Sequence, residues 1–169
     1  IRFYNDSKGT NVGAVVKSEK SRKEVSDTYQ VSVYNKLTDS LLKSVDAVDI
    51  VTPYLTHFSL TKRCLCYVDV MVEKPMAATY RQSLELARLA KKQKRVLMVG
   101  HIYRFHPVIN ELKKMLAKMP RPQLIDGKLI NPVGGRMIDN TKLEFLHFFD
   151  IVDYFFGEKP IFSSETSRD

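Results

Sequence analysis

The chain of 169 residues has no tryptophan, only two cysteines and no long apolar run. Its most apolar segments, such as residues 68–72, are far too short to span a bilayer. The first four residues lack the apolar core and the small-residue cleavage site of a secretory signal. These absences predict a cytoplasmic protein that is not associated with a membrane.

The scarcity of cysteine also limits redox and metal chemistry. Cys64 and Cys66 stand two residues apart in one predicted helix, where side chains at i and i+2 point to different faces. That geometry disfavours both a disulfide and a shared metal ion, so we expect no metal site and interpret the pair as small apolar filler. Free thiols of this kind suit a reducing compartment.

Acidic residues are outnumbered by basic ones, and the formal net charge is +8. The basic residues are spread along the chain, with clusters at residues 17–23, 91–95 and 113–118, which is typical of a solvated surface. The excess would still attract an anionic ligand, such as a phosphorylated cofactor or a nucleotide-sugar. Zinc-ligand spacing, a recognition-helix signature and interleaved aromatic and basic residues are all missing, so no nucleic-acid partner is expected.

The apolar pattern alternates between short strands and amphipathic helices. Short apolar strands that are each followed by a helix are typical of parallel strands covered on both faces. The sequence therefore predicts an α/β fold with a doubly wound parallel sheet. Strands are predicted at residues 11–16, 31–33, 46–52, 69–73 and 96–100, and helices at residues 19–29, 38–43, 56–66 and after the cap residue Thr79.

The rhythm changes near residue 103, which we take as a domain boundary. Helices are predicted at residues 105–119 and 142–156, the second ended by Gly157, and strands at residues 123–130 and 161–166. These strands cannot close a sheet by themselves, so residues 104–169 are predicted to form the first part of a second domain. The chain is therefore expected to be a piece of a longer protein.

Polar residues follow three consecutive predicted strands, where a buried core would not place them. In open α/β sheets, ligands bind where parallel strands end at their carboxyl edge. We therefore predict one ligand-binding rim at this edge. Its members are Thr52, Pro53 and His57 after the first of these strands, Glu73 and Lys74 after the second, and His101 and Arg104 after the third.

The strand ends also carry recognisable motifs. They are DAVDIVTP at residues 46–53, VEKP at 72–75, VGH at 99–101 and RFHP at 104–107. This series, followed by LHFFD at residues 146–150, resembles the glucose-fructose oxidoreductase, inositol dehydrogenase and rhizopine-catabolism (Gfo/Idh/MocA) family. The resemblance covers roughly residues 10–115 and resumes at residue 146.

The resemblance implies an NAD(P)-dependent oxidoreductase that transfers a hydride between nicotinamide and a secondary alcohol of a sugar, polyol or nucleotide-sugar. It implies a Rossmann domain at residues 1–103, with the rim residues lining the cofactor site. The α+β domain that follows would present an open sheet, which forms the substrate face and often an oligomer interface. A homo-oligomer, either a dimer or a tetramer, is therefore expected.

Lys74 is the first candidate catalytic residue. The resemblance implies that it lies near the nicotinamide ribose and the substrate hydroxyl, aimed by a cis bond before Pro75. It would lower the pKa of the alcohol and help to hold the alkoxide. The competing interpretation is a solvated lysine at a strand end.

His147 is the second candidate catalytic residue. On its predicted helix, Asp150 and Tyr154 lie three and seven residues further on, so the three share one polar stripe. A carboxylate one turn away would orient the imidazole and favour its charged form. The resemblance implies that a histidine at this place is the acid/base for the sugar hydroxyl, with Asp150 as a further catalytic candidate. A packed, hydrogen-bonded histidine is the alternative.

One motif of dinucleotide-binding domains is missing. Gly9 and Gly13 do not lie between a strand and a helix, as the phosphate-binding G-x-G-x-x-G turn requires. Either that turn lies outside this sequence, or the protein has lost dinucleotide binding and is a non-catalytic binding or regulatory protein. Leu143 also replaces the aspartate that the family has four residues before the histidine.

The end of the strand at residues 11–16 bears on the choice of cofactor. NAD enzymes usually place an acidic residue there to hold the ribose hydroxyls. Lys17, Ser18 and Arg22 could instead hold a 2′-phosphate, which favours NADP over NAD. Glu19 would shift the preference back towards NAD.

Overall fold

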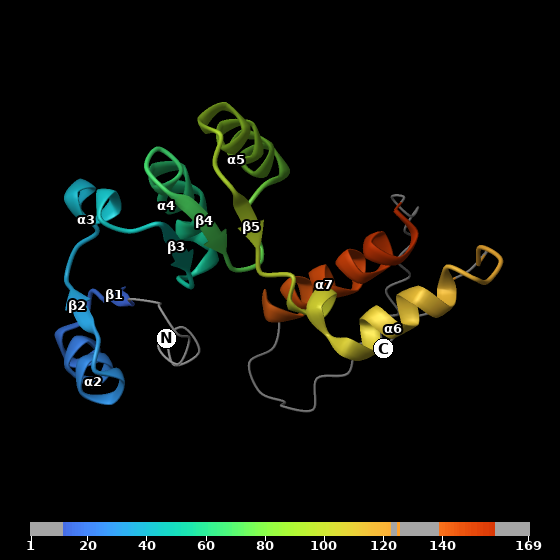
Figure 1. Ribbon diagram of the computed structural model, residues 1–169, viewed down its shortest axis with the longest axis horizontal. Helices are drawn as coiled ribbons and strands as arrows, with labels where there is room; N and C mark the ends of the chain where they lie inside the picture. Colours follow the sequence, from blue (N-terminus) through green and yellow to red (C-terminus); the bar gives the residue numbers. More distant parts are fainter. Residues whose placement is uncertain (1–11, 123–124, 126–138, 158–169) are drawn as a thin grey trace. The chain divides into compact units, whose positions relative to one another are not determined.

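A computed structural model of the chain describes residues 12–122, 125 and 139–157, with side chains of the last helix described from residue 145 (Figure 1). The chain divides into two compact units, Ile1–Ala47 and Val48–Asp169, which are treated separately below. The predicted domain boundary at residue 103 lies inside the second unit and stays a prediction.

The first unit contains two parallel strands and two capped helices. Its elements are β1 (Gly13–Val15), α2 (Glu19–Tyr29), β2 (Ser32–Tyr34) and α3 (Asp39–Lys43). The register pairs Gly13 with Ser32 and Val15 with Tyr34. Ser18 and Thr38 begin the helices, because each side chain accepts a hydrogen bond from a backbone N–H three residues on. The predicted helix at residues 19–29 is confirmed over its whole length.

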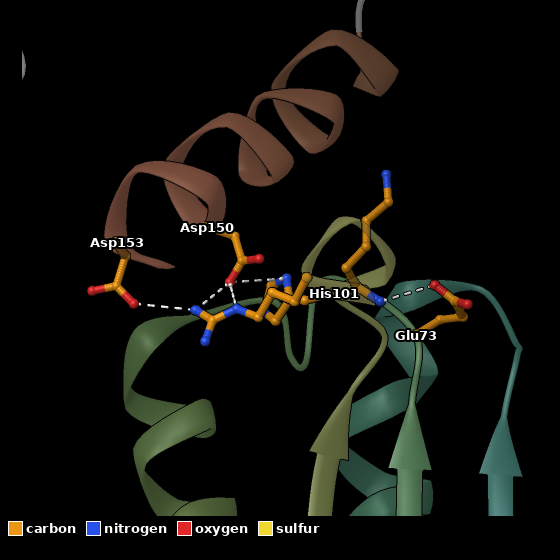
Figure 2. Close-up of polar contacts among 6 residues, drawn as sticks. Glu73, His101, Asp150 and Asp153 are labelled. Atoms are coloured by element: carbon orange, nitrogen blue, oxygen red, sulfur yellow. Dashed lines mark hydrogen bonds and ion pairs between the residues drawn. The ribbon is translucent and has the colours of Figure 1, made fainter. Parts of the chain in front are cut away.

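The second unit contains three strands, and its first helices pack on them. Its elements are β3 (Ala47–Ile50), η1 (Tyr54–Thr56), α4 (His57–Cys64), β4 (Asp69–Val72), α5 (Tyr80–Gln93), β5 (Leu97–Val99), η2 (Ile102–Phe105), α6 (Pro107–Leu116) and α7 (Asp139–Phe156). The strand order is β3-β4-β5, and the three strands run in the same direction (Figure 2). This arrangement confirms the predicted parallel sheet with crossover helices, although the described strands form two sheets rather than one.

The core of this unit lies between β4 and the helix pair α4 and α5. Helix α4 contacts both β4 and α5. Alternate residues of β4, Val70 and Val72, are buried together with Leu65 and Leu86. Burying each such side chain contributes about 2 kcal/mol to folding. Met98, on the neighbouring strand, is 38% exposed.

Two predicted helices end earlier than expected. The helix predicted at residues 56–66 ends at Cys64, where the N–H of Cys66 bonds to a carbonyl three residues back. The helix predicted at residues 105–119 runs from Pro107 to Leu116 and ends in the same way. Tightening to this 3₁₀ pattern is a common way to close a helix. The predicted strand at residues 161–166 and nearly all of the one at 123–130 lie outside the described residues.

Within the described part of the chain, no helix has both the length and the apolar composition needed to cross a membrane.

The two thiols differ in environment and in predicted reactivity. Burial raises the pKa of the Cys64 thiol to about 11, an effect that neighbouring Arg63 opposes, whereas Cys66 is exposed. Because the thiolate is the reactive species, iodoacetamide at about pH 7.5 should alkylate Cys66 and leave Cys64 intact. Peptide mass spectrometry measures both sites, and denaturant should expose Cys64. Equal labelling of the two sites in folded protein would contradict this prediction.

Candidate functional site

The ends of the three strands meet at one edge of the sheet, as the sequence predicts. The N–H of Glu73 donates to the carbonyl of Ile50 at 3.0 Å, which joins the ends of β4 and β3. The N–H of Gly100 donates to the carbonyl of Val72 at 2.8 Å, which joins the ends of β5 and β4. Residues that leave these strands are therefore neighbours in space (Figure 2).

The Glu73 carboxylate is folded back towards the main chain. Its Oε2 accepts a hydrogen bond from the N–H of Lys74 at 3.2 Å (Figure 2). It also lies against Gly100, where an added Cβ would stand 3.1 Å from Oε2. The Lys74–Pro75 bond is cis, as the resemblance implies. Glu73 thus supports the backbone of half-buried Lys74, and its predicted contact with a cofactor stays a prediction.

His57 is the most deeply buried of the predicted rim residues, with 1% of its surface exposed. Its Nδ1 lies 2.8 Å from the carbonyl oxygen of Pro75, and its Nε2 lies 2.7 Å from that of Thr52. Both ring nitrogens therefore face backbone carbonyls. The Thr52 hydroxyl lies 2.7 Å from that of Thr56, which in turn donates to the Pro53 carbonyl. These contacts hold the rim together, and direct cofactor contacts of Thr52, Pro53 and His57 stay predictions.

Arg104 contacts two carboxylates of α7 rather than standing open at the rim. Its Nε donates to Asp150 Oδ1 at 2.8 Å, and its Nη2 lies 2.6 Å from the same oxygen (Figure 2). Nη2 also donates to Asp153 Oδ2 at 3.1 Å. Hydrogen bonding to Asp150 raises the pKa of Arg104 further above its ordinary value, so the cation is permanent. His101 completes the cluster, with Nδ1 3.5 Å from Asp150 Oδ1.

This cluster changes the interpretation of Asp150. The sequence assigned its carboxylate to His147, but the contacts described for it are with Arg104 and His101. His147 is buried, and its ring packs edge-on against Tyr103 with 4.8 Å between centroids. Asp150 therefore anchors the helix that carries His147, and the catalytic roles of both residues stay predictions.

Three further residues that hold α7 in place, Asn110, Lys113 and Asp153, were not predicted from the sequence. The Tyr154 hydroxyl donates to Asn110 Oδ1 at 2.8 Å, and the Lys113 ammonium lies 3.4 Å from the centre of the Tyr154 ring. Asp153 adds its carboxylate to the Arg104 cluster. Of these, Asp153 had a signal in the sequence, because it stands one helical turn after Asp150 and doubles the negative charge on that face.

In the first unit, the predicted phosphate-binding residues lie at the turn between β1 and α2. Ser18 caps α2, and Lys17 is exposed. The Arg22 guanidinium is turned onto the main chain, where Nη1 donates to the carbonyl of Lys17 at 2.5 Å and to that of Val16 at 3.3 Å. Lys17 is therefore the cation of this turn that solvent reaches most directly. No group of three potential metal ligands occurs among the described residues.

The contact between Glu73 and Gly100 predicts a specific coupling. A Gly100→Ala methyl would meet three atoms of the Glu73 carboxylate at 3.1–3.2 Å, so the carboxylate would have to shift relative to the Lys74 N–H. We expect a loss of about 1 kcal/mol in the free energy of unfolding, at the lower end of the range for overpacking because a carboxylate at the end of a side chain can move, measured by urea denaturation. In a Glu73→Ala background the carboxylate is gone, so the same methyl should cost clearly less. Equal costs in the two backgrounds would show that the contact does not constrain the site.

The position of His101 predicts a pH dependence of stability. Burial lowers the pKa of His101 below its ordinary value of 6.5, and Arg104 lowers it further. The carboxylates of Asp150, Asp153 and Glu73 raise this pKa, Asp150 most strongly, but burial outweighs them. Below pH 6.5 the unfolded chain takes up a proton that the folded chain resists, so stability should fall as the pH decreases from there. His101→Gln should flatten this part of the profile, measured by urea unfolding between about pH 7.5 and about pH 5.5. An unchanged slope in the variant would contradict the assignment.

Comparison with known proteins gives a consistent picture. The family model described as an oxidoreductase family with an NAD-binding Rossmann fold matches residues 1–101. A UDP-N-acetylglucosamine 3-dehydrogenase of Acidithiobacillus ferrooxidans is 31% identical over 126 residues, covering 73% of this chain and 40% of the relative. An inositol 2-dehydrogenase of Corynebacterium glutamicum is 24% identical over 95% of this chain and 50% of its own length. The chain thus spans about half, or less, of the length of these relatives.

Solved structures share the fold. The crystal structure of the UDP-N-acetylglucosamine 3-dehydrogenase from Acidithiobacillus ferrooxidans matches with a TM-score of 0.58 and 31% identity, covering 62% of this chain and 34% of that one. A 3-ketoreductase from Actinomadura kijaniata, in complex with NADP and TDP-benzene, matches with a TM-score of 0.60. At 23% identity, over 68% of this chain and 36% of the other, that second likeness concerns the fold alone.

Proposed function

Because the chain belongs to the Gfo/Idh/MocA family of oxidoreductases with an NAD-binding Rossmann fold, we propose that its full-length protein is an NAD(P)-dependent dehydrogenase or reductase. The substrate would be a secondary alcohol of a sugar, polyol or nucleotide-sugar, or the corresponding ketone. The names of two relatives, a UDP-N-acetylglucosamine 3-dehydrogenase and an inositol 2-dehydrogenase, support this substrate class. The observation that carries the proposal is Lys74 at the meeting point of three parallel strand ends.

The residues of the first unit fit a cofactor that carries phosphate. Helix α2 begins directly after β1, so its first N–H groups face the turn that also holds exposed Lys17. Glu19, in the first turn of α2, would repel the additional negative charge of a 2′-phosphate. Arg22 is engaged with main-chain carbonyls, so Lys17 carries most of the preference. This balance supports a modest preference for NADP over NAD.

In the second unit, the proposed chemistry needs a cation and a proton acceptor. A bound nicotinamide supplies the hydride acceptor or donor. The Lys74 ammonium would hold the developing alkoxide, since a positioned charge stabilises the transition state more than the neutral alcohol. His147 would take up the hydroxyl proton. Arg104 would keep α7, and with it His147, in place through Asp150.

A titration of full-length protein with NADH and NADPH, followed by cofactor fluorescence, tests the proposal. We expect both to bind, NADPH more tightly. With UDP-N-acetylglucosamine and myo-inositol as trial alcohols, Lys74→Ala should lower turnover about 100-fold or more, because general acid–base and alkoxide-stabilising groups contribute that much. Its cofactor affinity should stay within a few fold.

The matched control is Lys62→Ala, which removes a lysine 52% exposed and paired with Glu85 at the surface. A surface pair contributes little, so activity and cofactor affinity should both stay near wild type. If neither NADH nor NADPH binds, the proposal is overturned and the non-catalytic alternative is favoured. Unchanged turnover in Lys74→Ala would remove that lysine from the mechanism.

A further inference from the structure

His57 joins two backbone segments through a single ring. The carbonyl of Thr52 belongs to the chain that leaves β3, and the carbonyl of Pro75 lies one residue after Lys74. His57 itself is the first residue of α4, so its ring ties the start of that helix to the ends of two strands. With only 1% of its surface exposed, the histidine is closed to solvent.

The two contacts have a definite hydrogen-bond requirement. A backbone carbonyl oxygen only accepts, so each of the two oxygens needs an N–H from the ring. A neutral imidazole has one N–H and serves one carbonyl, whereas a ring with hydrogen on both nitrogens serves both. The two contacts, 2.8 Å for Nδ1 and 2.7 Å for Nε2, are made by nitrogens at different positions of the ring. An amide side chain of suitable length can therefore keep a donor at one position and remove the other.

We propose that His57 is a positioning residue that holds the Pro75 carbonyl, and through it the segment carrying Lys74, against the end of β3. The backbone of Lys74 is then supported from two sides, by His57 beyond it and by the Glu73 carboxylate before it. His57 sets where the lysine side chain leaves the main chain and contacts no substrate itself. This inference rests on the proposed function of Lys74, and its test separates the two.

Two substitutions divide the ring contacts. The amide nitrogen of His57→Asn lies near the position of Nδ1 and keeps a donor for Pro75, whereas that of His57→Gln lies near Nε2 and keeps a donor for Thr52. If the Pro75 contact positions Lys74, the Asn variant should retain most of the wild-type kcat. The Gln variant, like His57→Ala, should lose about tenfold or more, because small misplacements of a reacting group are costly. Cofactor affinity should change little in all three.

A second measurement on full-length protein does not depend on turnover. Acetylation of lysines by limiting acetic anhydride, mapped by mass spectrometry, reports the environment of each ammonium group, and Lys62 serves as the internal reference. The labelling rate of Lys74 relative to Lys62 should change in the Gln and Ala variants and stay near wild type in the Asn variant. Urea unfolding of the three variants confirms that each is folded under the assay conditions.

The outcomes are distinguishable. Equal losses of kcat in the Asn and Gln variants, with Lys74 labelling unchanged in both, would overturn the positioning role and leave the function of Lys74 intact. A labelling change confined to the Gln and Ala variants, in a protein whose turnover does not depend on Lys74, would support positioning and overturn the proposed catalytic role of Lys74. If the Ala variant fails to fold, the Asn and Gln variants still decide, because only the first keeps a donor for Pro75. If the Asn or the Gln variant fails to fold, Lys74 labelling decides: unchanged labelling in a folded variant that lacks the Pro75 donor would overturn the positioning role.

Discussion

The register between β4 and β5 determines which residues lie side by side at the carboxyl edge of the sheet, where Lys74 stands. Val72 stands opposite Val99, so Glu73 and Gly100 leave their strands side by side. A Cβ at position 100 would stand only 3.1 Å from Glu73 Oε2, so glycine lets the Glu73 carboxylate lie where it accepts the N–H of Lys74. A slip of one residue would turn every side chain of β4 to the opposite face and separate this pair. The pairing of two short strands thus helps to fix the backbone at Lys74, the proposed catalytic lysine.

A buried carboxylate, that of Asp150, fixes the position of α7. The Asp150 side chain is only 6% exposed and is balanced by Arg104, a residue 46 positions away. Such a pair adds little net stability, because both charges lose hydration, but removing one partner is costly. Its main effect is therefore to specify where α7 lies. Arg104, predicted from its place after a strand to contact the cofactor, holds α7 through Asp150, and its cofactor contact stays a prediction.

The sequence predicted the local elements well because their signals are local. Ser18, Thr38 and Thr79 each accept a hydrogen bond at the start of the expected helix, and the rim follows from the rule that parallel strands end together. It did not predict which partner each polar side chain takes. Asp150 stands one turn from His147, yet Arg104 offers it two donors on one guanidinium. That choice depends on distances set by the tertiary fold, which spacing along the chain does not contain.

Several rim residues use their polar atoms to hold other parts of the protein in place. Those of Glu73, His57 and Arg104 contact main-chain groups or α7, and all three hold other parts in place. Fixing the backbone on both sides of Lys74 still leaves its long side chain several rotatable bonds, whose restriction costs up to about 2 kcal/mol. If Lys74 acts as proposed, this support of its backbone is advantageous. A fixed point of departure keeps the ammonium within reach of the reacting oxygen, and the flexible stem lets it follow that oxygen as its charge develops.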